Sequence, residues 1–191
     1  AGAANMAEAY GKLTGRPGIC FVTRGPGATN ASIGIHTAFQ DSTPVILFIG
    51  QVGSDATERE AQQEIDYRRM YGQMAKWVAQ IDRPERVPEM VSHAFHLAVS
   101  GRPGPVVLAL PEDLLKATAT VATTARYQRV AAHPGANDMN RLREMLAQAQ
   151  RPFVMLGGGG WNKQACDDFR AFAQANALPV GCTYRCQDLF D

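Results

Sequence analysis

The sequence Ile19-Cys-Phe-Val-Thr-Arg-Gly-Pro-Gly-Ala-Thr-Asn30 decides the fold. Its first four residues, 19–22, are a short and wholly apolar run, which is typical of a strand covered on both faces of a sheet. A Gly-Pro-Gly turn follows, and residues 27–40 have the pattern of a helix. Such a junction lies at the carboxyl edge of a parallel sheet, where ligands bind in open α/β folds.

Segments on both sides of this junction alternate between apolar runs and helical spacing. Helical patterns cover residues 3–14, 65–72 and a stretch that begins between Pro84 and Pro88 and runs to about Ser100. Further strands are expected at 45–49, 76–81 and 106–110, and a polar loop at 53–63. The sequence therefore predicts an α/β fold, with a parallel sheet wrapped by helices.

Composition changes after Pro111, where large apolar residues become scarce. Residues 116–137 are rich in Thr and Ala and predict an extended linker. A new alternation then predicts helices at 138–149 and 163–175 and strands at 153–156 and 179–182. We expect one domain over 1–115, a linker over 116–137, and the start of a second Rossmann-like α/β domain over 138–191.

Bulk properties exclude several classes of function. The chain has 191 residues, 46% of them hydrophobic, and a net charge of +1. No basic cluster suggests nucleic acid, and no apolar run approaches the roughly 20 residues that span a bilayer. The four cysteines are too irregularly spaced for a disulfide framework or a zinc site, so we expect reduced thiols in a cytoplasmic protein and no metal site in this chain.

The Thr23–Asn30 turn supports two interpretations when it is taken alone. Gly25 and Gly27 would let the backbone approach a ligand closely, and the next helix presents free N–H groups at its start. A Gly-Pro turn is also a common structural device, in which Asn30 would only stabilise the turn and Thr23 would be an ordinary strand-end hydroxyl.

The wider sequence resembles the pyrimidine-binding domain of thiamine-diphosphate enzymes of the acetolactate synthase type. The resemblance rests on a series of short motifs in a fixed order: Gly2-Ala-Ala-Asn-Met-Ala-Glu-Ala-Tyr-Gly11, Thr14-Gly-Arg-Pro-Gly18, Gly25-Pro-Gly-Ala-Thr-Asn30, Asp41-Ser-Thr-Pro-Val45, Gly50-Gln-Val52, Gln63-Glu-Ile-Asp66, Gly101-Arg-Pro-Gly-Pro-Val106 and Leu110-Pro-Glu-Asp113. It runs from residue 1 to about 115, and more loosely to 191.

The resemblance implies roles for individual residues. Six positions would bind the cofactor on its aminopyrimidine side, with Gln63 reaching toward the reactive thiazolium: Thr23, Gly25, Pro26, Gly27, Asn30 and Gln63. Lys76 would lie beside the substrate channel. Arg102 and Gly157, Gly158 and Gly159 match positions that contact FAD in the flavin-bearing members.

The resemblance also implies what this chain leaves out. The family's catalytic glutamate, which hydrogen-bonds the pyrimidine ring, would lie directly before Ala1, so we expect no catalytic residue within the chain. Magnesium and the diphosphate would be held by a later domain. We therefore expect a piece of a longer enzyme, inactive alone, that binds the cofactor weakly or not at all.

The resemblance implies a parent enzyme that cleaves the C–C bond of a 2-oxo acid, usually by decarboxylation, with carboligation as a further step, and that assembles as a homodimer or tetramer. Gln62 and the segment Thr183-Tyr-Arg-Cys186 depart from the flavin-bearing synthases, which leaves FAD and the substrate open. The alternatives are a nucleotide-binding module built on the glycines 157–160, or an assembly domain without catalysis.

Overall fold

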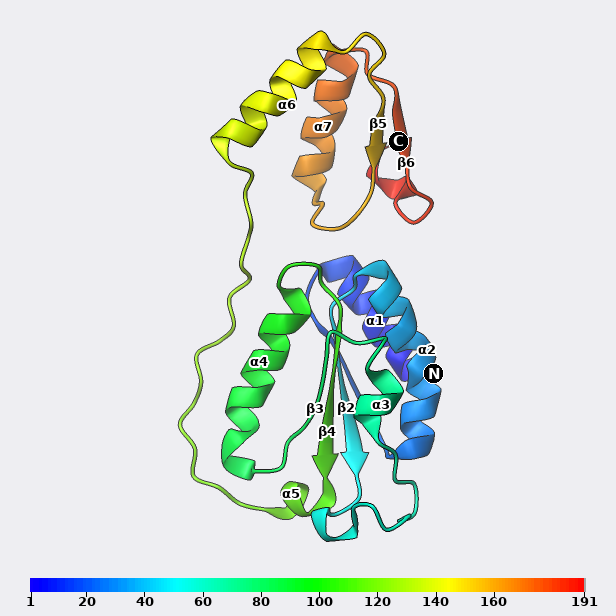
Figure 1. Ribbon diagram of the computed structural model, residues 1–191, viewed down its shortest axis with the longest axis vertical. Helices are drawn as coiled ribbons and strands as arrows, with labels where there is room; N and C mark the ends of the chain where they lie inside the picture. The colour runs from blue at the N-terminus through cyan, green and yellow to red at the C-terminus, as the bar shows by residue number, and fades with distance from the viewer. Residues whose placement is uncertain (191) are drawn as a thin grey trace. The chain divides into compact units, whose positions relative to one another are not determined.

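The computed structural model describes residues 1–190 and divides the chain into two compact units. The first is Ala1–Val130, and the second begins at Ala131. Each unit has its own parallel sheet and its own helices, as Figure 1 shows. The two units are therefore described separately.

The first unit is built on a four-stranded sheet in the order β1-β2-β4-β3. Its strands are β1 (Gly18–Val22), β2 (Val45–Gln51), β3 (Trp77–Gln80) and β4 (Pro105–Pro111). All three pairings are parallel, and Val22, Ile49 and Ala109 lie in register across the first three strands of the sheet. The ends of all four strands therefore meet at one carboxyl edge, which confirms the predicted parallel α/β sheet.

Helices pack on both faces of this sheet (Figure 1), but one face of β1 stays open, since Ile19 is 42% exposed and Phe21 is 67% exposed. The expectation that residues 19–22 are covered on both faces was therefore wrong, because β1 is an edge strand. On one face, α1 (Gly2–Thr14), α2 (Gly25–Asp41) and α3 (Tyr67–Tyr71) pack on Cys20, Leu47 and Val107. On the other face, α4 (Val87–Val99) packs on alternate residues of the same strands, among them Ile46, Val106 and Leu108. Because both faces are covered, β2 and β4 are buried along nearly their whole length, as their unbroken apolar sequences require.

Close contact between α1 and α2 depends on small residues. A Cβ atom at Gly34 would lie 2.7 Å from the Cβ atom of Ala4, so the helices approach more closely than larger side chains permit.

Three short elements complete this unit: η1 (Ser54–Ala56), η2 (Pro84–Arg86) and α5 (Glu112–Lys116). The sequence pattern missed α5, because a helix of one turn has no measurable period.

The predicted elements differ from the observed ones mainly at their ends. The helix predicted from residue 65 begins at Tyr67, since the side chain of Asp66 accepts hydrogen bonds from the first backbone N–H groups. The expected linker has no helix or strand from residue 117 to 135, but its part up to Val130 belongs to the first unit. There the ring of Tyr127 stacks on Phe95, with 5.1 Å between ring centroids.

The second unit has the same strand–helix–strand pattern on a smaller scale. It contains α6 (Ala136–Gln148), β5 (Val154–Leu156), α7 (Lys163–Ala175), β6 (Val180–Cys182) and η3 (Gln187–Leu189). The strands β5 and β6 pair in parallel, and Trp161 and Phe190 both pack edge-on against Phe169 of α7. The glycines 157–160 lie in the turn that follows β5.

Candidate functional site

The turn between β1 and α2 lies at the carboxyl edge of the sheet. Thr23 follows the last residue of β1, Arg24 precedes the first turn of α2, and Pro26 lies within that turn, where its missing N–H leaves no hydrogen bond unmade. A Cβ atom at Gly25 would lie 3.0 Å from the carbonyl oxygen of Gln63, and one at Gly27 would lie 3.0 Å from the Cβ atom of Val22. Contacts within the protein thus account for both glycines.

Two neutral polar side chains extend from this turn. Thr23 and Asn30 are both exposed, one before α2 and the other on its second turn. The amide nitrogen of Asn30 donates a hydrogen bond to the carbonyl oxygen of Pro26 over 2.9 Å, which orients the amide, and its oxygen accepts no hydrogen bond from the described residues. A hydroxyl and an amide of this kind suit a neutral ring with donors and acceptors, such as an aminopyrimidine.

Gln63 is held beside the same turn. The backbone N–H of Gly25 donates to the carbonyl oxygen of Gln63 over 2.9 Å, and the side chain of Gln63 is exposed. The structure thus brings together Gln63 and the residues from Thr23 to Asn30, which the sequence places far apart. It also gives Gln63 a φ of 69°, a left-handed conformation that non-glycine residues seldom adopt.

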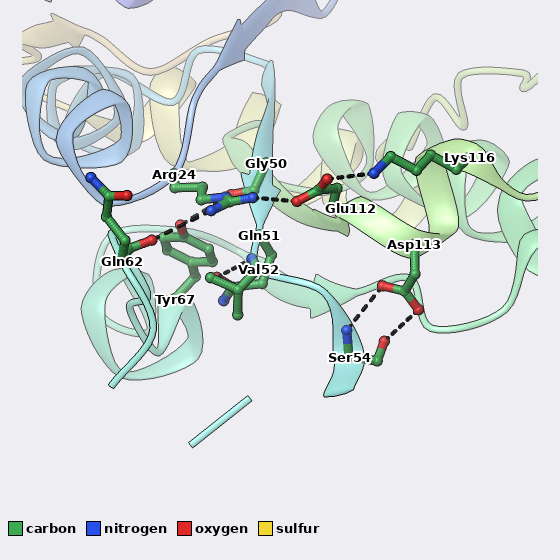
Figure 2. A network of polar contacts seen from close by, with 10 residues as sticks. All are labelled: Arg24, Gly50, Gln51, Val52, Ser54, Gln62, Tyr67, Glu112, Asp113 and Lys116. Atoms are coloured by element: carbon green, nitrogen blue, oxygen red, sulfur yellow. Dashed lines mark hydrogen bonds and ion pairs between the residues drawn. The ribbon is translucent and has the colours of Figure 1, made fainter. Parts of the chain in front are cut away.

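A polar network lies along the same edge (Figure 2). Nη2 of Arg24 lies 2.7 Å from Oε2 of Glu112, and Oε1 of Glu112 lies 2.6 Å from Nζ of Lys116. The carboxylate of Asp113 accepts two bonds of 2.9 Å from Ser54, one from its backbone N–H and one from its hydroxyl. Four members of this network, Arg24, Glu112, Asp113 and Lys116, line a cavity of about 320 Å³.

The charges of this network favour ionised carboxyl groups. The hydrogen bond and charge of Lys116, with the charge of Arg24 adding to them, lower the pKa of Glu112. The two hydrogen bonds from Ser54 lower the pKa of Asp113. Both acids therefore remain charged at neutral pH and hold the start of α5 against β1 and the loop after β2.

Two buried tyrosines stabilise the backbone at the carboxyl edge of the sheet. The hydroxyl of Tyr67 donates to the carbonyl oxygen of Gly50 over 3.1 Å, and that of Tyr71 donates to the carbonyl oxygen of Ala28 over 2.5 Å. Burial raises the pKa of Tyr67 to about 12, although the charge of Arg24 acts in the opposite direction. These bonds tie α3, which follows the Gln63 loop, to β2 and α2.

Lys76 and Arg102 lie at the opposite, amino edge of the sheet. Nζ of Lys76 donates to the carbonyl oxygens of Leu97 and Ser100, at the end of α4. Arg102 donates to the hydroxyl of Ser42 over 2.7 Å and to the carbonyl oxygen of Phe39 over 3.1 Å, at the end of α2. Each cation therefore caps a helix C-terminus, where positive charge is favourable, and neither lies with the group around Thr23.

Gly157, Gly158 and Gly159 belong to the second unit. A Cβ atom at Gly157 would lie 2.9 Å from Cγ2 of Thr183, so packing requires glycine there. Gly158 has a φ of 74°, and Gly159 has no atom within 4 Å of the place a Cβ would occupy. The turn is tight and open to ligands, but its proposed FAD contact stays a prediction.

A second cavity of about 440 Å³ lies elsewhere in the first unit, between Arg16, Val91 and Tyr127. It contains none of the predicted site residues. Within residues 1–190, no group of three or more His, Cys, Asp or Glu side chains is arranged to hold a metal ion. No described helix is long and apolar enough to cross a membrane.

Sequence reasoning missed the residues that hold the site together. It gave no role to Arg24, Ser54, Tyr67, Glu112 or Lys116. Arg24 comes two residues after the end of β1, and Glu112 directly follows β4, so both could have been placed at the carboxyl edge from the sequence. Their pairing could not have been foreseen, because it depends on the strand order.

Comparisons with known proteins give a consistent result. Residues 1–70 match the model of the thiamine pyrophosphate enzyme N-terminal TPP binding domain, and residues 139–191 match that of the thiamine pyrophosphate enzyme central domain. The chain is 34% identical over 186 residues to the acetolactate synthase large subunit of Corynebacterium glutamicum, covering 95% of this chain and 30% of that protein. It is 35% identical over 187 residues to the acetolactate synthase isozyme 2 large subunit of Escherichia coli, covering 96% of this chain and 34% of that protein.

A solved structure has the same fold. The thiamine diphosphate-dependent 4-hydroxybenzoylformate decarboxylase of Rhodococcus jostii RHA1 matches with a TM-score of 0.84 and 24% identity, over 94% of this chain and 35% of that one. The chain thus spans about a third of the length of these relatives. On the two matched domain models and the acetolactate synthase relatives, this chain belongs to the thiamine-diphosphate enzymes of the acetolactate synthase type.

Proposed function

We propose that this chain binds the aminopyrimidine side of thiamine diphosphate at the carboxyl edge of its first sheet. The observation that carries the proposal is the hydrogen bond from Gly25 to Gln63, because it gathers the two segments that the family resemblance assigns to the cofactor. The binding residues are Thr23, Gly25, Pro26, Gly27, Asn30 and Gln63.

The residues at this edge fit the ring better than they fit the diphosphate. Thr23, Asn30 and Gln63 offer uncharged donors and acceptors, which match a neutral heterocycle. A diphosphate with its Mg²⁺ needs clustered oxygen ligands and cations, and the described residues contain no metal-binding group of acids. Mg²⁺ and the diphosphate would therefore be held by other parts of the enzyme.

The role of these residues in catalysis is orientation. When bound, the cofactor supplies a carbon nucleophile for a carbonyl group and stores the electron pair released by C–C cleavage. Thr23 and Asn30 would hold the aminopyrimidine ring in one orientation against the β1–α2 turn. Gln63 would extend toward the reactive thiazolium. Correct placement of reacting groups can contribute several kcal/mol, roughly 7–11 in favourable cases, to lowering a barrier.

We propose that the complete enzyme acts on a 2-oxo acid, cleaving the bond next to the carbonyl by decarboxylation and passing the product to an acceptor. Support comes from the acetolactate synthase relatives, of which this chain covers about a third. An assembly of two or four subunits, FAD as a second cofactor near Gly157–Gly159 or Arg102, and a cytoplasmic location belong to the same proposal.

The test is a calorimetric titration of the chain with thiamine diphosphate, with and without Mg²⁺. Ring contacts alone predict weak binding, with a Kd of about 1 mM or higher, that Mg²⁺ does not tighten. Loss of this binding in the Asn30→Ala variant, with no loss in Asn140→Ala on α6, would support the assignment. Tight binding that depends on Mg²⁺ would show that the chain also holds the diphosphate and would overturn the proposal.

A further inference from the structure

The loop that carries Gln63 has an unusual backbone. Glu58, Glu60 and Gln63 have φ angles of 62°, 55° and 69°, and none of them is a glycine. Side chains with a Cβ atom disfavour this left-handed region. Such a conformation persists only where the surroundings hold it, and it often accompanies a functional site.

Two kinds of contact hold this loop. The carboxylate of Glu64 accepts bonds from the backbone N–H groups of Glu58 and Ala61, at 2.7 and 3.2 Å, and so closes the loop on itself. Contacts from outside come from the N–H of Gly25, from the side chain of Gln51 to the carbonyl oxygen of Ile65, and from Arg24.

Among the described residues, Arg24 is the only charged side chain of the β1–α2 turn that contacts the Gln63 loop. Its Nη1 lies 3.4 Å from the carbonyl oxygen of Gln62, while its Nη2 forms the 2.7 Å pair with Glu112. The guanidinium is therefore shared by three segments: the β1–α2 turn, the Gln63 loop and the start of α5 (Figure 2). A planar fork with two separate nitrogens can make both bonds at once, which a lysine does poorly.

Glu112 orients the guanidinium group of Arg24. The side chain of Arg24 is 29% exposed and that of Glu112 is 47% exposed, and Lys116 holds the second oxygen of Glu112. Because Glu112 already neutralises Arg24, the arginine is better suited to fixing the loop than to binding an anionic ligand.

We propose that Arg24 is a positioning residue of the cofactor site: held by Glu112, it fixes the backbone at Gln62 and so sets the place of Gln63. The role of Gln63 toward the cofactor rests on the proposed function, but the hold of Arg24 on the loop does not. Exposed ion pairs often contribute little to stability, so removal of Arg24 must have a measurable effect on the backbone of the Gln63 loop.

The test measures hydrogen exchange of the Gly25 and Glu64 amides in the cofactor-free chain. Arg24→Met should speed exchange at both amides by about twofold to fivefold. The amide of Ile81, which follows β3 and donates to the carbonyl oxygen of Ala109, should stay unchanged. The matched control is Arg86→Met, which removes a similar exposed pair with Glu89 on another part of the unit. Unchanged exchange at Gly25 and Glu64 in Arg24→Met would overturn the inference.

Two further measurements separate positioning from general destabilisation. High salt should speed Gly25 exchange in the wild-type chain and have no such effect in Arg24→Met, because screening weakens an exposed pair. If amide exchange in Arg24→Met is faster throughout the chain, the Glu112→Gln variant is measured instead. Faster exchange confined to the Gly25 region in Glu112→Gln supports the inference, and exchange equal to that of the wild type contradicts it. Cofactor titration of Arg24→Lys and of the wild-type chain is a separate measurement. If the wild-type chain fails to bind the cofactor, that result counts against the proposed function alone.

Discussion

The backbone N–H of Gly25 donates a hydrogen bond to the carbonyl oxygen of Gln63 over 2.9 Å, and this bond joins the turn after β1 to the loop between β2 and α3. Little space separates the two segments, since a Cβ atom at Gly25 would lie 3.0 Å from that oxygen and 3.1 Å from Cδ1 of Ile65. The geometry of the candidate site therefore depends on this contact.

Replacing Gly25 by alanine should push the Gln63 loop away from the turn. Inserting a methyl group into a packed contact costs about 1–3 kcal/mol of unfolding free energy, and urea denaturation should show a loss in that range. Gly2→Ala is the control, because nothing lies within 4 Å of the added Cβ at that position and α1 should tolerate it. Equal stability of the two variants would show that the close contact does not constrain the loop.

Alkaline pH should destabilise the first unit through Tyr67. Burial raises the pKa of Tyr67 to about 12, above the usual 10.0, so the folded state favours the neutral phenol. Its contribution is complete below pH 10 and is lost as the pH rises from 10 through about 12. Denaturation midpoints across this window should fall less in Tyr67→Phe than in the wild type, and identical profiles would refute the assignment.

Acidic pH should release the loop after β2. Hydrogen bonds from the backbone and hydroxyl of Ser54 lower the pKa of Asp113 below its usual 3.8. The stabilisation is therefore present above that value and is lost as the pH falls through the lowered pKa. Asp113→Asn should remove this part of the acid dependence, and Ser54→Ala should reduce it, which amide exchange at Ser54 and Asp113 can follow. An unchanged acid profile in Asp113→Asn would contradict the role of this pair.

Lys76 should behave as a helix cap within this unit. Its ammonium group contacts the carbonyl oxygens of Leu97 and Ser100, and burial lowers its pKa. Lys76→Met should cost about 0.3–1 kcal/mol of unfolding free energy and speed exchange in the last turn of α4, without changing exchange at Gly25. Arg83→Met is the control, since Arg83 is 71% exposed and its ion pair with Glu85 lies outside the helix end. Undiminished stability would favour the substrate-channel role implied by the family resemblance.

The sequence predicted the sheet and its helices because their signals are local. Runs such as Val45–Ile49 and Val106–Leu110 are wholly apolar, and Gly-Pro turns mark where helices begin. The boundaries near Asp66 and the one-turn helix after Pro111 were missed, because side-chain capping and very short helices leave little periodic signal.

The site was only partly predictable for a related reason. Thr23, Gly25, Asn30 and Gln63 were identified by resemblance, and the structure brings them to one edge. The order β1-β2-β4-β3 places the end of β4 near Arg24, and no local pattern reports that order. The same topology separates Lys76 and Arg102 from this group within the first unit, because each lies just before the start of a strand and so at the amino edge.

The most direct test of the account is an NMR titration of the isotopically labelled chain with thiamine diphosphate. Binding of the aminopyrimidine at the carboxyl edge predicts chemical-shift changes concentrated at Thr23, Gly25, Asn30 and Gln63, with none at Lys76. Changes confined to Gly157–Gly160 would instead favour a nucleotide-binding module in the second unit. Such a result, or the absence of any change at several millimolar cofactor, would contradict the central claim.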